Sequence, residues 1–222
     1  MMTSSFNIQF NMENIDLQKV NGFYFPANAH IKMSNAWILE PTKILKHVEE
    51  KNICIQAGGN VGYITSVYAD VFETVYTFEP IYENFFCLTK NLHQENVIKF
   101  QACLGNENKL VDLALPKQKN IARPNFGTFC VTGAGLIPTL TIDQFNLPDC
   151  NLIHLDIEGY EYYAILGAIN TIKKFSPVVV LEINRSLKNF NLTKNDIFTL
   201  MENINYQDVD QINENTVFKK IR

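Results

Sequence analysis

Apolar residues recur along this chain with two different periods, and the two periods alternate over most of the sequence after residue 52. Short apolar runs predict β-strands, at Ile53–Ile55, Val75–Phe78, Val97–Leu104, Asn151–Ile157 and Pro177–Ile183. Between these runs, apolar residues repeat every three or four positions, which predicts helices, from Val61 to Val71, from Ile81 to Leu92 and from Ile165 to Ile172. Strands that alternate with helices pair in parallel through right-handed crossovers. The pattern therefore predicts an α/β fold with a doubly wound sheet.

The end of the chain predicts one more helix and a closing hairpin. Thr193 is suited to cap a helix N-terminus, and the apolar residues after it have helical spacing, at Ile197, Leu200, Met201 and Ile204. Two further strand-like runs flank Asn213–Asn215, at Tyr206–Val209 and Thr216–Ile221. We expect these two runs to pair as the last hairpin of the sheet.

Residues 1–45 form a predicted N-terminal β/α appendage, and residues 46–222 form the main domain. Apolar and polar residues alternate near the start, as they do in a half-buried strand, at Phe6, Ile8 and Phe10. Asn21-Gly22 separates two short apolar runs, and both residues tolerate the positive φ of a two-residue hairpin turn. A helix is expected to follow Pro41, over Thr42–Lys51.

One connection, residues 116–135, has no clear periodicity and contains Pro124 and three glycines. Loops of this length are uncommon inside compact domains and often have a function. Two interpretations remain open. The segment is either a lid over a binding site or a surface insertion with a short hairpin of its own.

The composition narrows the class of protein. The chain has 222 residues, of which 46% are hydrophobic and 19% charged, so a disordered chain, a collagen and a coiled coil are excluded. The net charge of −4 gives no support for a nucleic-acid partner. Five cysteines without a CxxC pair argue against a disulfide framework or a zinc site. With no long apolar run or secretory signal, we expect a cytoplasmic protein without a membrane partner. The oligomeric state stays open.

A glycine-rich turn and a distant acid suggest a nucleotide site. The turn Gly58–Gly62 joins the first core strand to a helix, and glycines there let backbone N–H groups approach a ligand. The second strand ends at Glu79, about twenty residues on, where an acid can bind both ribose hydroxyls of an adenosine. This spacing does not separate NAD from S-adenosylmethionine. The order G-G-N-x-G and the acids after the fourth strand favour S-adenosylmethionine. Tight packing of the turn and a solvated Glu79 are the structural alternatives.

Several segments together resemble the FkbM-type S-adenosylmethionine-dependent methyltransferases, over roughly residues 50–185. In chain order they are Ile55–Tyr63, Thr77–Pro80, Ala102–Gly105, Thr141–Asp143, Leu155–Glu161 and Pro177–Glu182. The combination of F-E-P with D-x-E-G-x-E is the specific part. The resemblance implies a Rossmann-like class I methyltransferase sheet with a final antiparallel strand, and S-adenosylmethionine as cofactor. It also implies a methyl acceptor that is a hydroxyl of a small molecule or glycan.

The resemblance further implies which residues bind the cofactor. The glycine turn would cradle its methionine and ribose part, Glu79 would hold the ribose diol, and Ala102 would line the adenine. The complete expected set is Gln56, Gly58, Asn60, Gly62, Glu79, Pro80, Ala102 and Asp156. Gln56 departs from the family, which usually has Asp at this position, facing the cofactor's ammonium. A neutral amide gives up that charge–charge attraction.

Transfer of a methyl group to a hydroxyl benefits from a group that takes the hydroxyl proton. Asp156, at the carboxyl end of the fourth strand, is the best placed candidate. His154 and Glu158 share its face by the period of two, so His154 either orients Asp156 or is a satisfied core residue. Glu182 ends the fifth strand at the same edge. The expected catalytic residues are therefore Asp156, His154 and Glu182.

Other roles remain open for the neighbouring residues. Glu158 and Glu161 either cap the next helix or line the site. Asp156, Glu158 and Glu182 could together hold a divalent cation, although no metal is expected. Three aromatic residues either line an acceptor pocket or pack in the core, at Tyr160, Tyr162 and Tyr163.

Two other functions remain as alternatives. A non-catalytic module that binds the nucleotide would be consistent with Gln56. A nucleic-acid methyltransferase has weak support from three basic residues in the long connection, Lys117, Lys119 and Arg123. That alternative is disfavoured by the net charge and by the lack of the Asn/Asp-Pro-Pro-aromatic motif of amino methyltransferases.

Overall fold

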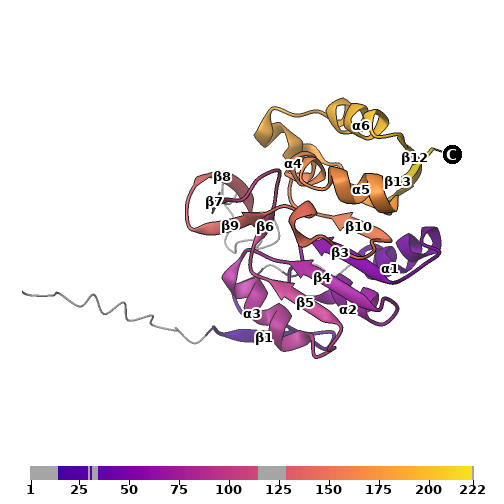
Figure 1. Cartoon of the computed structure of the whole chain (residues 1–222). Helices are drawn as coiled ribbons and strands as arrows, with labels where there is room; N and C mark the ends of the chain where they lie inside the picture. The colour runs from indigo at the N-terminus through magenta and orange to yellow at the C-terminus, as the bar shows by residue number, and fades with distance from the viewer. Residues whose placement is uncertain (1–14, 30, 32–34, 115–128, 222) are drawn as a thin grey trace, which may run out of the picture.

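The computed structural model describes residues 15–29, 31, 35–114 and 129–221, and a seven-stranded sheet lies at its centre (Figure 1). The strands are β3 (Ile53–Ala57), β4 (Thr74–Phe78), β5 (Val97–Phe100), β10 (Leu152–Leu155), β11 (Val178–Glu182), β12 (Tyr206–Ile212) and β13 (Asn215–Lys220). They lie in the order β12-β13-β11-β10-β3-β4-β5. The five core strands are parallel, and β13 is antiparallel to both β11 and β12. The predicted doubly wound sheet with a final antiparallel strand is confirmed.

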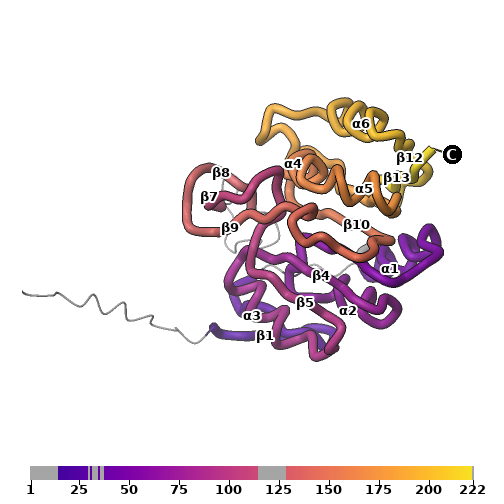
Figure 2. Tube along the Cα trace, viewed as in Figure 1, coloured from indigo at the N-terminus to yellow at the C-terminus, as the bar shows by residue number. Residues whose placement is uncertain are grey.

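Helices cover both faces of this sheet, as the trace shows (Figure 2). One face carries α1 (Asn35–Ile44), α2 (Tyr63–Ala69) and α3 (Tyr82–Asn91), and the other carries α4 (Glu161–Leu166), α5 (Ile169–Phe175) and α6 (Lys194–Asn203). None of the helices in the described part of the chain has the length and apolarity needed to cross a bilayer.

Alternate residues of each core strand enter two separate cores. In β10, Ile153 and Leu155 pack toward α4 and α5, whereas Leu152 packs toward α2. In β3, Ile55 lies on the first face and Cys54 on the second. Since both faces are buried, these strands read as continuous apolar runs.

A second, four-stranded sheet lies beside the carboxyl edge of the first. It contains β6 (Cys103–Leu104), β7 (Lys109–Ala114), β8 (Cys130–Ala134) and β9 (Ile137–Leu140), in the order β6-β9-β7-β8. The predicted single strand Val97–Leu104 is wrong, because the chain leaves β5 after Phe100 and pairs Cys103 with Thr139.

This second sheet also bears on residues 116–135. Most of that segment lies outside the described residues, but β8 pairs antiparallel with β7. Residues 129–135 thus contribute one strand, β8, of a hairpin whose partner, β7, precedes the segment. No strand is predicted from the sequence over residues 105–140, because short strands of mixed polarity have little periodicity to detect.

The N-terminal hairpin consists of β1 (Leu17–Val20) and β2 (Phe23–Pro26). Its turn residues Asn21 and Gly22 have φ of 49° and 88°, as the predicted turn requires. Tyr24 anchors the hairpin to α3, because its N–H donates to Asn91 Oδ1 at 2.8 Å and its carbonyl accepts from Asn91 Nδ2 at 2.9 Å. The predicted strand at Phe6–Phe10 lies outside the described residues.

The predicted helix Thr42–Lys51 is wrong in its bounds. Helix α1 begins at Asn35 and includes Pro41, and only a short 3₁₀ turn, η1 (Leu45–His47), follows it. A proline in a helix gives up one hydrogen bond, and here the helix continues past it to bury Ile44 completely. The helical run then ends because Val48 turns to an extended conformation.

The predicted helix through Ile165–Ile172 is divided into α4 and α5. The division follows from contacts of Asp143, which lies in the 3₁₀ turn η2 (Asp143–Phe145). Its carboxylate accepts the N–H groups of Asn170 and Thr171 at 3.0 and 2.8 Å, which caps a new helix start. Gly167 lies at the division, where a Cβ would approach the Gly105 carbonyl oxygen to 2.0 Å.

The C-terminal elements match the expectation. Thr193 caps α6 through a capping box, in which its hydroxyl accepts from Asp196 N–H and the Asp196 carboxylate accepts from Thr193 N–H. The closing hairpin is β12–β13, and a 3₁₀ helix, η3 (Arg185–Phe190), precedes α6.

Replacing the cap tests this assignment. Thr193→Ala removes the acceptor for the Asp196 N–H, so the free energy of unfolding should fall by about 1 kcal/mol. Thr199→Ala, at an exposed position inside the same helix, should leave stability unchanged or slightly higher because Ala favours helices. Urea unfolding followed by circular dichroism measures both, and equal effects of the two variants would contradict the cap.

Candidate active site

An open cavity lies where β3, β4 and β10 end, with about 640 Å³ of atom-free space including its mouth. Parallel strands collect functional groups at this edge of a sheet. Of the expected site residues, six line the cavity: Gly58, Asn60, Glu79, Pro80, Ala102 and Asp156. Four are not in its lining: Gln56, Gly62, His154 and Glu182.

The glycine turn is held against β4 and β10. The N–H groups of Gly58 and Gly59 both donate to the Phe78 carbonyl, at 3.1 and 2.9 Å. Gly58 has φ of 81°, and a Cβ there would lie 1.9 Å from the Asp156 carbonyl oxygen. The absence of a side chain is therefore what lets the turn lie against the strand that carries Asp156.

Glu79 joins two turns at the rim of the cavity. Its Oε2 accepts the Asn60 N–H at 2.7 Å, and its Oε1 accepts the Ile81 N–H at 2.9 Å. The side chain is 4% exposed, and burial raises the pKa of its carboxyl to about 7 despite these hydrogen bonds. A solvated strand end is excluded.

Gln56 lies beneath the turn and is completely buried. Its Oε1 accepts hydrogen bonds from the hydroxyls of Thr65 and Thr77, both at 2.8 Å. Its Nε2 donates to the carbonyls of Ala57 and Gly58, at 3.3 and 3.1 Å. The amide can make both kinds of bond, whereas an ionised Asp only accepts. In this chain, position 56 supports the turn from below.

Gly62, at the end of the same turn, allows Leu92 to pack closely against the backbone. It precedes α2 with φ of 93°, and a Cβ there would lie 2.9 Å from Leu92 Cγ. The glycine lets α2 start close to the end of α3.

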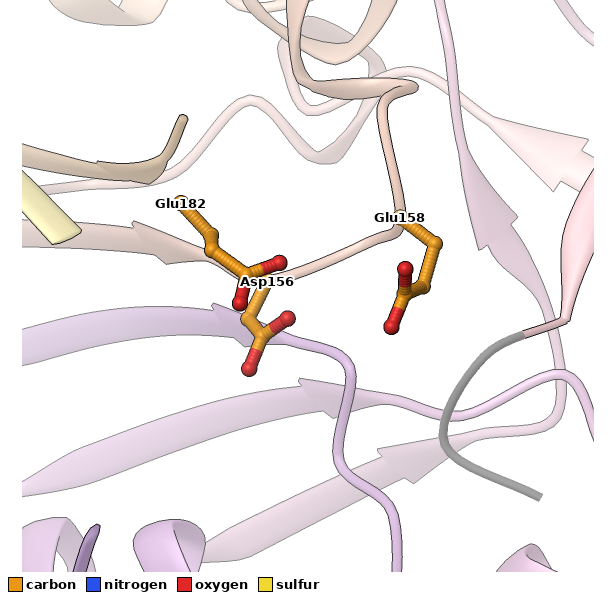
Figure 3. Close-up of side chains that lie close together, drawn as sticks. All are labelled: Asp156, Glu158 and Glu182. Atoms are coloured by element: carbon orange, nitrogen blue, oxygen red, sulfur yellow. The ribbon is translucent and has the colours of Figure 1, made fainter. Parts of the chain in front are cut away.

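Three carboxylates cluster at the ends of β10 and β11. Asp156, Glu158 and Glu182 have oxygen atoms within 4.8 Å of one another (Figure 3). Burial raises the pKa of Asp156, and burial with the nearby Asp156 raises the pKa of Glu182 to about 12. The carboxyls of Asp156 and Glu182 interact with each other, and two acids this close favour a state in which they share one proton.

The D-x-E-G-x-E segment divides its acids between two tasks. Glu158, with φ of 57°, lines the cavity and accepts a hydrogen bond from Ser186 Oγ at 2.9 Å. Burial, with the nearby Asp156, raises its pKa to about 7. Glu161 is fully buried instead, and its Oε1 accepts the N–H groups of Ile157 and Gly159 at 2.9 and 3.3 Å. Glu161 therefore holds the turn that presents Glu158.

His154 is fully buried between two neutral partners. Its Nδ1 lies 2.8 Å from the Tyr68 hydroxyl, and its Nε2 lies 3.2 Å from Asn215 Oδ1. Burial lowers the pKa of the ring to about 4. Both nitrogens are engaged away from Asp156, which corresponds to a satisfied core histidine.

Two features are not named from the sequence as site residues. One wall of the cavity comes from the second sheet and its flank, through Leu113, Phe129 and Val131. The last two lie in the long connection, for which one of the two predictions is a lid over a binding site. The other feature is Glu40, on α1, which is 5% exposed and interacts electrostatically with Asp156; no sequence signal points to it.

Solved structures share this fold. The precorrin 8w decarboxylase of Methanobacterium thermoautotrophicum superposes with a TM-score of 0.51 at 9% identity, over 90% of this chain and 97% of that chain. Methyltransferase FkbM from Methylobacillus flagellatus KT gives 0.49 at 17%, over 81% and 50%, so this chain spans about half its length. M. jannaschii TYW2, in complex with AdoMet, gives 0.48 at 13%, over 92% and 86%. At such identities the likeness concerns the fold alone.

Sequence comparison identifies the family. None of the curated proteins compared with this chain matches it. The model of the methyltransferase FkbM domain, in contrast, matches residues 56–207, which include the glycine turn, Glu79, Asp156 and Glu182. S-adenosylmethionine is the methyl donor of this family. The chain therefore belongs to the FkbM methyltransferase domain family.

Proposed function

We propose that the protein transfers the methyl group of S-adenosylmethionine to a hydroxyl of a small molecule or glycan. One observation carries this proposal. The cavity is lined both by Glu79, a buried acid that joins two turns, and by Asp156, which interacts with Glu182 behind it. The first suits a ribose diol, and the second suits removal of a hydroxyl proton.

The residues around the cavity fit an adenosyl group. Each oxygen of Glu79 accepts one backbone N–H, and Oε1 also accepts a long hydrogen bond from Asn84 Nδ2 at 3.5 Å. A carboxylate oxygen can accept two hydrogen bonds, so Oε2 has a free position for a ribose hydroxyl. Apolar residues continue from Glu79 along the wall, where a purine base would be dry: Phe78, Ile81, Ala102 and Leu104. When bound, the cofactor supplies an activated methyl on a sulfonium, so the protein supplies mainly alignment and exclusion of water.

Asp156 is the proposed base. In this proposal the shared proton lies on Glu182, which donates a hydrogen bond to Asp156, so Asp156 is ionised and faces the cavity. Asp156 would accept the proton of the acceptor hydroxyl, while the bound cofactor would supply the methyl group and leave as the thioether S-adenosylhomocysteine. General base catalysis of this kind is typically worth about 10²–10⁴-fold.

His154 and Gln56 take supporting roles in this proposal. His154 has a lowered pKa and two engaged nitrogens, so the proton passes to Asp156 alone. Gln56 holds the glycine turn. From the sequence, Gln56 is the feature that favours a non-catalytic module. Because its amide hydrogen-bonds the glycine turn, its presence has a structural explanation and does not favour that alternative.

Cofactor binding tests the proposal through Glu79. Isothermal titration should detect S-adenosylmethionine binding to the natural protein, and Glu79→Gln should weaken it about tenfold or more, because a hydrogen bond to a charged group is worth about 1.5–3 kcal/mol. The matched control is Glu73→Gln, an exposed acid at the opposite end of β4. No binding by the natural protein at millimolar cofactor would reject the assignment.

Turnover tests Asp156. Asp156→Asn should lower kcat at least about 100-fold in a methyl-transfer screen against sugars and phenols, with cofactor affinity unchanged. Glu182→Gln should retain much of the rate, since its amide still donates to Asp156, and the exposed control Asp70→Asn should be unchanged. Full activity of Asp156→Asn would refute its role as base.

The buried acids also predict how stability depends on pH. The pKa values of Glu79, Glu158 and Glu161 are raised to about 7, 7 and 8 from 4.5, so between pH 5 and 8 the folded state binds more protons than the unfolded state. The free energy of unfolding should therefore rise as pH falls from 8 to 5, by about 2 kcal/mol or more.

Glu161→Gln offers the matched test of that sign, because it removes one titrating group and keeps the shape of the side chain. Urea unfolding at several pH values should show a weaker pH dependence in this variant. Glu95→Gln, an exposed acid, should follow the natural protein. Stability that increases with pH over this range would show that these acids are ionised at no cost.

A further inference from the structure

A second hollow, which we call the aromatic groove, continues the candidate active-site cavity outward. It has about 780 Å³ of atom-free space including its open side, and it is lined by Lys109, Val111, Val131, Tyr160, Tyr163 and Phe190 among others. Val131 and Tyr160 line both hollows. The groove lies between the second sheet and the α4 region, which Figure 1 shows beside each other.

One face of β7 connects the two hollows. Lys109, Val111 and Leu113 share this face by the period of two, and the first two line the groove whereas Leu113 lines the cavity. Leu113 pairs with Val131 just after the register shift at Asp112/Leu113. Such bulges redirect side chains next to binding sites. The groove therefore adjoins the cavity along the wall that β7 provides.

Three aromatic rings form the opposite wall. Tyr160 and Tyr163 have ring centroids 4.7 Å apart, and Phe190 lies 5.2 Å from Tyr160 and 6.0 Å from Tyr163. Tyr160 is 5% exposed, whereas Tyr163 and Phe190 are half-buried. Tyr160 thus fixes the wall, and the two other rings offer surface to a ligand.

Polar groups border this apolar surface. Lys109 is exposed and interacts with the Tyr160 hydroxyl, while its ammonium lies 2.8 Å from Glu107 Oε1. The exposed β8 residues Thr132, Gly133 and Ala134 complete the open side. A ligand there would meet rings on one side and hydrogen-bonding groups with water on the other.

We propose that the aromatic groove binds the methyl acceptor and that this acceptor is a saccharide. The inference rests on the proposed function, because it places a hydroxyl-bearing ligand next to the Asp156 cavity. A sugar ring has a face of C–H bonds that packs on Tyr163 and Phe190, and hydroxyls at its edge that face Lys109 and solvent. An open groove also leaves room for further sugar units.

A phenol is the competing ligand, and the geometry favours it less. A phenol is apolar on both faces and gains most from an enclosed pocket. Among the described residues, this groove covers one face of a ligand, and exposed β8 residues border its other side.

Saturation-transfer NMR tests the groove without turnover. The probes are methyl α-D-glucopyranoside, methyl α-L-rhamnopyranoside and lactose, with catechol as the phenol, each at millimolar concentration with and without S-adenosylhomocysteine. At least one saccharide should receive saturation from the natural protein. Tyr163→Ala and Phe190→Ala should each weaken saccharide binding about three- to tenfold. Tyr163→Phe, which keeps the ring, should bind the saccharide about as well as the natural protein.

The control is Phe86→Ala, which removes an aromatic ring that is 38% exposed on α3 and should not change saccharide binding. Saturation of catechol alone, no saccharide binding, or binding that Tyr163→Ala and Phe190→Ala leave unchanged would each overturn the proposal. Titration of the same variants with S-adenosylmethionine reports separately on the donor site. If the natural protein did not bind S-adenosylmethionine, the proposed function would be rejected. Saturation-transfer NMR would still show separately whether a saccharide binds in the groove.

Discussion

The site depends on one buried carboxylate, that of Glu79. Each of its oxygens accepts a backbone N–H from a different turn, the β3–α2 turn at Asn60 and the β4–α3 turn at Ile81. Charge-assisted bonds of this kind are among the stronger ones in proteins, and here they hold the two turns in a fixed relation across the cavity. Burial still opposes ionisation, as the raised pKa shows. Ionising Glu79 therefore costs free energy, and a ligand that donates two hydroxyl hydrogen bonds to its carboxylate would lower that cost.

A second constraint is the number of acids at the carboxyl edge. Glu40, Asp156, Glu158, Glu182 and Glu214 interact there, and Arg185 is the cation that opposes them at Glu158. Like charges this close cannot all be ionised, so protons must be retained. In the proposed mechanism the Asp156–Glu182 pair shares one of them, and Asp156 is the acceptor.

Family membership and geometry contribute at different levels. The FkbM domain match covers the strands and turns that build the cavity, and it agrees with the arrangement of Gly58, Glu79 and Asp156. The same match covers the elements of the proposed acceptor side, but their arrangement as a groove is a matter of geometry. The aromatic groove depends on β7, β8 and the Tyr160–Phe190 contacts, which join segments far apart in the chain.

The sequence by itself determined the parallel core, both hairpins and the Thr193 cap, because local periodicity and turn chemistry decide these features within a few residues. Six of the residues expected at the site line the cavity, and the expectation for the full set comes from the family resemblance. Only the tertiary structure decided the rest. Pro41 lies inside α1, which continues past it to bury Ile44, and α5 starts afresh because Asp143 caps it from another element. Likewise, Gln56, His154 and Glu161 become supports while Glu158 faces the cavity. Such assignments follow from which partner each polar group finds on burial, and those partners come from distant parts of the chain.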